Sequence, residues 1–146
     1  MRALIQRVSH AQVQVEKQTL GAIQQGILAL IGIFKNDDKA QANRLLERIL
    51  QYRIFPDAAG KMNLSLQDLQ GGLLVVPQFT LAADTQKGTR PGFSTAMPPE
   101  QSAQLFDYFV SQAQAAHQPV ATGQFGANMQ VTLCNDGPVT FILETH

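Results

Sequence analysis

The chain has 146 residues, of which 45% are hydrophobic and 15% charged, and its formal net charge is zero. This composition excludes a disordered chain, and the length favours a single globular domain spanning residues 1–146. Because the net charge is zero, no global field attracts nucleic acid, and any RNA contact must use a local patch.

The N-terminal part of the chain is predicted to form strands. Residues 3–8 form a first strand, and residues 11–15 form a half-buried strand in which apolar residues alternate with glutamines. A turn at 16–18 leads to a returning strand at 19–23, and the apolar run 26–34 is predicted as a central strand. We expect these pieces to form an antiparallel meander.

A helix is predicted after Asp37 and Asp38, because Asp38 and Gln41 have the spacing of a capping box. Five apolar residues then recur at helical spacing and predict a buried stripe: Ala42, Leu45, Leu46, Ile49 and Leu50. Arg44 and Arg48 share another face of this helix. That face is either a solvated charged surface or a grip on phosphate.

The most informative stretch is LLVVPQFTLAAD at residues 73–84. Its apolar beginning follows two glycines and predicts a strand over residues 73–80 that is buried on both faces. Pro77, Gln78, Phe79 and Thr80 then place a chain break, an amide, an aromatic ring and a hydroxyl at the end of the strand. Such groups can line a cleft; alternatively, the strand emerges into solvent with Phe79 in the core.

A loop of unusual length for a compact domain is predicted at residues 84–97. It contains two glycines, a proline and the cations Lys87 and Arg90. Its flexibility and charge suit a lid or a phosphate contact, and a plain surface loop is the alternative.

A second helix is predicted to begin at Pro98 and Pro99, because proline is well tolerated in a first turn. Its buried stripe comprises Leu105, Phe106, Phe109 and Ala113. We expect His117, near the end of this helix, to face solvent, where a cation suits a helix C-terminus.

Two further strands are predicted near the C-terminus. A loop at 123–128 carries Phe125, and alternation predicts strands at 129–134 and 139–143. Between them stands Asn-Asp-Gly-Pro at 135–138, and Asp-Gly between alternating strands is a hairpin signal. The proline removes an amide donor and permits a cis bond. This segment is therefore either a plain hairpin turn or a turn that pushes backbone carbonyls outward as acceptors.

General catalytic motifs are absent: the sequence has no G-x-S-x-G, phosphate loop, dinucleotide fingerprint or zinc-protease helix. Thr80 could act as a nucleophile, but no base that would activate it is evident nearby. The lone Cys134 excludes an internal disulfide, and His10, His117 and His146 lack metal-ligand spacing, so no metal is expected. Without an evident signal peptide or membrane helix, we expect a cytoplasmic protein with no membrane partner.

Four segments distributed along the chain match one known family: ALIQRV near the start, YRIFPDAAGKMNL at 52–64, QFTLAAD at 78–84 and NDGPVTF at 135–141. Through them the chain resembles the bacterial D-aminoacyl-tRNA deacylases over its whole length. The signature motifs of that family, S-Q-F-T and N-x-G-P-x-T, fall at 77–80 and 135–140. The chain departs from the first motif, because Pro77 stands where the family usually has serine.

The resemblance implies a mixed α/β fold, a three-layer arrangement of mixed, barrel-like β-sheets with helices on one side, assembled as a homodimer. It also implies a reaction. The family hydrolyses the ester that joins a D-amino acid, or mischarged glycine, to the 3′ end of tRNA, and it rejects L-aminoacyl substrates. No cofactor is expected.

By resemblance, Gln78, Phe79 and Thr80 are the expected catalytic residues, with backbone amides around Phe79 and Thr80 as oxyanion donors. The Gly137-Pro138 bond is expected to be cis and to reach into the pocket of the partner subunit, which makes the active site a cross-subunit one. There its carbonyls would hold the ammonium group of the amino acid and exclude L side chains.

The resemblance also places Arg7 behind that turn, and Phe125 and Met129 near the terminal adenosine. In this family the 2′-hydroxyl of the terminal ribose is thought to activate the water, so the protein contributes mainly positioning. Two alternatives remain open. One is an esterase that uses Thr80 as nucleophile on a small ester; the other is a non-catalytic RNA-end-binding module or an editing domain of a synthetase.

Overall fold

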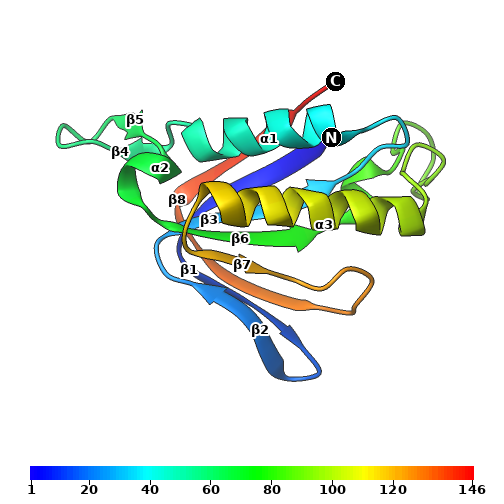
Figure 1. The fold of residues 1–146 in the computed structure, drawn as a ribbon, viewed down its shortest axis with the longest axis horizontal. Helices are drawn as coiled ribbons and strands as arrows, with labels where there is room; N and C mark the ends of the chain where they lie inside the picture. The colour runs from blue at the N-terminus through cyan, green and yellow to red at the C-terminus, as the bar shows by residue number, and fades with distance from the viewer.

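A computed structural model describes every residue from Met1 to His146. The strands are β1 (Arg2–Val15), β2 (Gln18–Ile23), β3 (Gly26–Gly32), β4 (Phe55–Pro56), β5 (Met62–Leu64), β6 (Gly72–Pro77), β7 (Val120–Thr122) and β8 (Gln130–Glu144). The helices are α1 (Lys39–Gln51), α2 (Leu66–Leu69), the 3-10 helix η1 (Phe79–Ala82) and α3 (Pro99–Ala116). Figure 1 shows α1 and α3 on one side of a strongly curved sheet, with both termini near α1.

The main sheet is mixed. Its strand order is β2-β1-β3-β6-β7, with β8 paired to β1. Strands β3, β6 and β7 run parallel to one another, and the pairs that involve β1 are antiparallel. The sheet curls until β2 approaches β7, where Gly21 lies against Ala121 and Thr122. This barrel-like mixed sheet with helices on one side confirms the predicted fold class (Figure 1).

The N-terminal meander was predicted wrongly, because β1 lies between its partners. A meander would place the strand at 18–23 in the middle. Instead, the first half of β1 pairs with β3, the second half pairs with β2, and β8 pairs with β1 along almost its whole length. A strand of 14 residues is long enough to serve both neighbours in succession.

β1 is also one strand, where the sequence predicted two. It has one extra residue, Ser9, opposite β8, and this bulge reverses the alternation of inward and outward side chains. Before the bulge, Ala3 and Ile5 belong to the core beneath the helices; after it, Ala11 and Val13 belong to the core inside the curl. The interruption between the two predicted strands, 3–8 and 11–15, therefore marks the point at which the apolar side chains of β1 change from one face of the sheet to the other.

The central strands β3 and β6 are buried on both faces, as their continuous apolar sequences predicted. Ile27 and Leu73 belong to a cluster of 23 buried residues that includes the inward faces of α1 and α3. Leu28 and Leu74 point the other way, into a cluster of 7 buried residues enclosed by the curled sheet. Packing on both faces therefore fixes β6, and with it the segment that follows Pro77.

Both long helices begin as predicted. A carboxylate oxygen of Asp38 accepts hydrogen bonds from the amides of Ala40 and Gln41, and the Gln41 side chain accepts one from the Asp38 amide. This is the complete capping box. α3 starts at Pro99 with Pro98 as its N-cap, and the predicted apolar stripes of both helices are buried. None of the helices has both the length and the apolar character required to cross a bilayer.

His117 is buried, so the prediction that it faces solvent is wrong. It caps the C-terminus of α3 in an extended conformation, and its Nε2 atom lies 2.6 Å from the carbonyl oxygen of Gly71. The ring therefore ties the end of α3 to the start of β6. The sequence also did not predict β7, whose 3 residues are too few to show a periodic pattern.

The pairing of Gly26 with Gly72, at the start of β3 and β6, leaves no room for a side chain at Gly26. A Cβ at Gly26 would lie 1.9 Å from the carbonyl oxygen of Gly72, which is backbone of the paired strand. We expect Gly26→Ala to lower the free energy of unfolding by about 3 kcal/mol or more, the upper end for overpacked sites, as measured by chemical denaturation.

Gly92→Ala is the matched control. Its Cβ would meet only Asp84, at 3.8 Å, an ordinary van der Waals distance. If Gly26→Ala unfolds at the same denaturant concentration as Gly92→Ala, the close pairing of β3 with β6 is not as described here.

Candidate active site

The end of β6 opens directly into a turn. Pro77 is its last residue, the amide of Gln78 still donates to the carbonyl of Ile31, and η1 begins at Phe79. The strand thus ends before the Phe79-Thr80 pair that the sequence analysis had included in it. Because β6 is rigidly packed, the side chains of this turn have a well-defined starting point.

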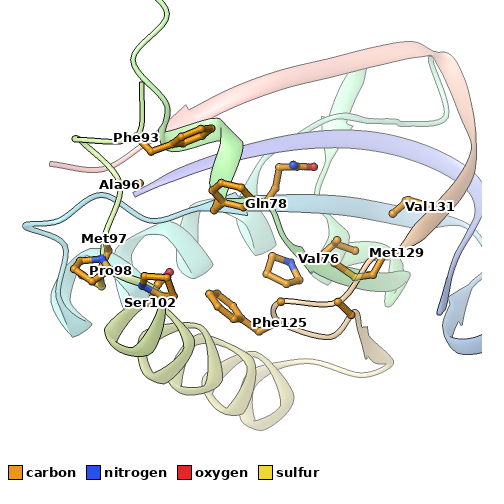
Figure 2. Close-up of a pocket in the computed structure, with 15 residues that line it drawn as sticks. Val76, Gln78, Phe93, Ala96, Met97, Pro98, Ser102, Phe125, Met129 and Val131 are labelled. Atoms are coloured by element: carbon orange, nitrogen blue, oxygen red, sulfur yellow. The ribbon is translucent and has the colours of Figure 1, made fainter. Parts of the chain in front are cut away.

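A pocket of about 720 Å³ opens at this end of β6 (Figure 2). Four segments of the chain line it: the end of β6 with η1, the loop before α3 with the first turn of α3, the loop after β7, and the start of β8. The lining residues are Val76, Pro77, Gln78, Phe79, Phe93, Ala96, Met97, Pro98, Pro99, Ser102, Phe125, Gly126, Ala127, Met129 and Val131. The volume suits one ligand of about the size of a nucleoside or a drug.

The structure brings together part of the predicted site. Gln78 and Phe79 line the pocket with Phe125 and Met129, although these two pairs are far apart in sequence. Thr80 stands next to the lining, and its hydroxyl accepts a hydrogen bond from Nε2 of Gln78. The pocket lining includes neither the Gly137-Pro138 pair nor Arg7.

Several lining residues were not predicted. Phe93 and Met97 come from the long loop, and Ser102 comes from the first turns of α3. An aromatic residue within a charged, glycine-containing loop was the one available signal for Phe93. Met97 and Ser102 carry no sequence signal, because their role depends on where α3 packs against β6.

Aromatic rings shape the pocket at two places. Phe79 and Phe93 pack with ring centroids 5.1 Å apart and an angle of 45° between the ring planes. Phe125 packs on Phe106 of α3 at 6.2 Å. Figure 2 shows Phe93 near one end of the pocket and Val131 near the other. The interior therefore offers mainly apolar surface to a ligand.

No residue with an ionisable side chain lines this pocket. Its polar groups are the amide of Gln78, the hydroxyl of Ser102 and the backbone. The two carboxyl groups with a lowered pKa lie outside it: hydrogen bonding from the Asn63 side chain lowers the pKa of Asp57, and hydrogen bonding from the Ser65 amide lowers that of Asp68. A chemical step here must therefore obtain its base from the ligand or from elsewhere.

The long loop at residues 84–97 is anchored. The Asp84 amide donates to the Gly92 carbonyl at 2.7 Å, and the Asp84 carbonyl accepts from the Gly92 amide at 2.9 Å. The Thr95 hydroxyl donates to the carbonyl of Ala82. Lys87 and Arg90 lie between the two ends, exposed and outside every ion pair. These two cations remain available to a negatively charged partner.

The other candidate cations are engaged. Arg44 forms an ion pair with Glu47 at 2.8 Å, three residues further along α1. Arg48 donates a hydrogen bond to the carbonyl of Glu144 at the end of β8. Arg48 is thus used to hold the C-terminal strand against α1, whereas Arg44 lies on an exposed charged face.

Asn-Asp-Gly-Pro at 135–138 belongs to a bulge of β8 at residues 136–139 rather than to a hairpin turn. Gln6 of β1 pairs with Thr140 and Val8 pairs with Asn135, so four residues of β8 stand opposite one residue of β1. The hairpin interpretation is therefore wrong, because β8 continues along the same partner strand on both sides. Gly137 and Pro138 are exposed, and the bond between them is cis, as the resemblance implied.

The Asn135 side chain fixes this bulge. Its carbonyl oxygen accepts from the Val139 amide at 2.7 Å, and its Nδ2 donates to the Val139 carbonyl at 3.3 Å and to the Thr140 hydroxyl at 2.9 Å. Asn135 is the first residue of the N-x-G-P-x-T motif, but the sequence alone did not predict this structural role.

Arg7 supports the bulge from behind, in the position that the resemblance implied. Its side chain is 12% exposed, and its guanidinium donates to the carbonyls of Asp136 and Ile54, each at 2.8 Å. Gly137 has a φ of +147°, and a Cβ there would lie 2.7 Å from a methyl group of Val139 and 3.2 Å from Arg7 Nη2. Glycine is therefore the residue that both the backbone angle and the space permit.

The chain is similar to known sequences over nearly its whole length. A sequence family described as D-Tyr-tRNA(Tyr) deacylase matches residues 4–144. The chain is 62% identical over 144 residues to a D-aminoacyl-tRNA deacylase of Ectopseudomonas mendocina, with 99% of each chain covered. It is 59% identical over 145 residues to a D-aminoacyl-tRNA deacylase of Pseudomonas syringae pv. syringae, with 99% of this chain and 100% of that one covered.

Two solved structures share the fold. A protein described as a c-Myc DNA unwinding element binding protein superposes with a TM-score of 0.96 at 40% identity, covering 100% of this chain and 99% of the other. A probable eukaryotic D-amino acid tRNA deacylase superposes with a TM-score of 0.85 at 17% identity, covering 99% and 98%. The second likeness concerns the fold alone.

The hydrogen bonds of Asn135 predict the effect of removing its side chain. Asn135→Ala leaves the Val139 amide without its partner, so we expect a loss of about 1–2 kcal/mol in the free energy of unfolding. Hydrogen exchange of the Val139 amide should accelerate in the same variant. Thr132→Ala, at an exposed position of the same strand, is the control and should change stability by less than about 0.5 kcal/mol. Unchanged exchange at Val139 would contradict this role of Asn135.

Proposed function

This chain belongs to the D-Tyr-tRNA(Tyr) deacylase family, and from that premise we propose that it hydrolyses the ester of D-aminoacyl-tRNA and of mischarged glycyl-tRNA in the cytoplasm. Its enzyme class follows from its relatives: it is a D-aminoacyl-tRNA deacylase, a hydrolase that acts on an ester bond. The observation that carries the proposal is the match over residues 4–144, which includes both the pocket and the bulge of β8. The products are the free D-amino acid and tRNA.

The pocket supports a substrate of this kind. Its size suits a single aminoacylated nucleoside, and apolar walls with aromatic rings suit a base and a ribose. We place the terminal adenosine against Phe125 and Met129, and the scissile ester beside Gln78. The first amides of η1, those of Phe79 and Thr80, have no partner within that helix and can donate to an oxyanion.

We further propose that the substrate supplies the base. The residues that line the pocket have no ionisable side chain, and the Thr80 hydroxyl is already hydrogen-bonded to Gln78. The 2′-hydroxyl of the terminal ribose lies beside the ester in every aminoacyl-tRNA and can orient the attacking water. Water adds to the carbonyl carbon, and the 3′-oxygen leaves with a proton. This account disfavours Thr80 as a nucleophile, since a threonine needs a base to activate it.

Replacing Thr80 tests where the base resides. Thr80→Ala should lower kcat by less than about tenfold, whereas a substrate with a 2′-deoxy terminal adenosine should lose more than about 100-fold, the usual cost of losing an acid–base group. Single-turnover hydrolysis of D-aminoacyl-tRNA measures both. A large loss in Thr80→Ala, with folding and substrate binding intact, would instead identify Thr80 as the nucleophile.

Selection against L-amino acids is proposed to come from a second copy of the chain. Gly137 and Pro138 do not line the pocket of their own chain, yet both residues are exposed. The residues on either side are held in place, because Arg7 donates to the Asp136 carbonyl and the Asn135 side chain accepts from the Val139 amide. In a homodimer, this bulge can enter the pocket of the partner subunit and accept hydrogen bonds from the substrate ammonium. A rigid backbone that fills the direction of an L side chain excludes L substrates but cannot exclude glycine.

The outer surface of β8 supports such a dimer. β8 pairs only with β1, so its other edge is free. Phe141 and Ile142 on this strand are 38% and 59% exposed, which leaves apolar surface that a second copy would cover.

Mixed dimers test whether the bulge acts across subunits. Gly137→Ala displaces the bulge, and Ala127→Trp fills the pocket, so each variant alone should lose hydrolysis of D-aminoacyl-tRNA. An equal mixture, dissociated and reassembled, should recover about a quarter of wild-type activity, because half of the dimers are mixed and each has one intact site.

The substrate panel completes this test. The wild type should hydrolyse D- and glycyl-tRNA and leave L-aminoacyl-tRNA intact, and the mixed dimers should show the same selectivity. An inactive mixture that nevertheless contains mixed dimers by native mass spectrometry would show that the bulge does not serve the partner's pocket.

A further inference from the structure

Two aromatic rings at the pocket mouth are more exposed than large apolar side chains usually are. Phe79 is 58% exposed and Phe93 is 43% exposed, and the rings contact each other with centroids 5.1 Å apart. The first lies on η1 and the second on the long loop, so the pair joins two segments that line the pocket. Figure 2 shows Phe93 near one end of the pocket. Exposing two aromatic rings to water is unfavourable. A ligand that covers them therefore gains binding free energy from the burial of this apolar surface.

The pair is held in position by its surroundings. The reciprocal hydrogen bonds between Asp84 and Gly92 end one residue before Phe93, and the Phe93 carbonyl accepts from the Ala96 amide at 3.2 Å. Thr95 is bound from both sides, through the carbonyl of Ala82 and the amide of Lys35. A ring on a loop fastened in this way loses little freedom when a ligand packs on it.

We propose that the Phe79–Phe93 pair stacks the base of the nucleotide that precedes the terminal adenosine of the tRNA. Every base has a π-face, and single-stranded RNA ends are commonly bound by stacking on phenylalanine. This inference rests on the proposed function, because it requires a single-stranded 3′ end to enter the pocket.

The choice of this nucleotide follows from size and exposure. A pocket of about 720 Å³ suits one nucleoside, so the next base remains outside it. The exposed pair stands at that boundary, whereas Phe125 is half-buried and packs on Phe106 of α3. Lys87 and Arg90, on the same loop as Phe93, are unpaired cations that can contact the phosphates of the strand. Charge and stacking surface thus occur together on one loop.

Phe93 can be changed without altering the amides proposed to bind the oxyanion. Phe93→Leu removes the stacking surface, so KM for D-aminoacyl-tRNA should rise about 5- to 100-fold with a smaller change in kcat. An abasic site in place of the preceding nucleotide should raise KM of the wild type by a similar factor. Combining the variant with the abasic substrate should add little, because both changes remove the same contact. Phe93→Tyr should restore most of the affinity.

A binding measurement that needs no catalysis also tests the proposed stacking. The chain contains no tryptophan, so Phe93→Trp introduces a single tryptophan at the proposed contact, whose emission can be excited apart from that of the two tyrosines. Its fluorescence should be quenched by a single-stranded RNA that ends in CCA and carries no amino acid. The same RNA with an abasic site before the terminal adenosine should quench it much less. Leu20→Trp, exposed on β2, is the control and should not respond.

The possible outcomes separate the two proposals. If the wild type hydrolyses D-aminoacyl-tRNA but the effects of Phe93→Leu and of the abasic site are additive, the stacking inference is wrong and the proposed function stands. If the wild type does not hydrolyse D-aminoacyl-tRNA, the proposed function itself fails. If Phe93→Leu changes the oligomeric state in size-exclusion chromatography, the pair belongs to a contact between copies and the stacking inference is overturned.

Discussion

Strands β1 and β8 pair along almost their whole lengths, and the remaining elements take their positions from this ribbon. On its other edge β1 pairs first with β3 and then with β2, so one strand organises most of the sheet. Two irregularities interrupt the ribbon at nearly the same place: Ser9 is extra in β1, and four residues bulge from β8 opposite Arg7. The first moves β1 from one core to the other, and the second projects Gly137 and Pro138 outward.

Arg7 connects these irregularities with the rest of the molecule. It is mostly buried, and its guanidinium binds the carbonyl of Asp136 in the bulge and that of Ile54 after α1. A planar group with several fixed donors suits two carbonyls at once. The backbone at Gly137 is thus held by side-chain hydrogen bonds on one side and open to solvent on the other. An exposed segment fixed in this way can meet a ligand without first being ordered.

The pocket depends on a different part of the architecture. β6 is packed on both faces, so its end is rigid, and the segments that complete the pocket come from α3, from the loop after β7 and from the start of β8. The pocket and the bulge lie on different parts of one chain. In the proposed mechanism, which uses both, the pocket of one copy and the bulge of a second copy together form one active site.

The sequence by itself determined the buried character of β3 and β6, the start and inward face of both long helices, and the four segments that reveal the family. These are local properties: continuous apolar runs, helical periodicity, a capping box at Asp38 and short motifs such as N-x-G-P-x-T. The sequence did not determine the order of the strands, the burial of His117, or the bulge at 136–139, which its Asp-Gly pair made resemble a hairpin. Each of these depends on which distant segment the chain meets, because β1 receives β8 from the far end of the chain and His117 meets Gly71. The membership of the pocket was decided in the same way, since residues as far apart as Gln78 and Met129 become neighbours only when α3 and the loop after β7 pack around the end of β6.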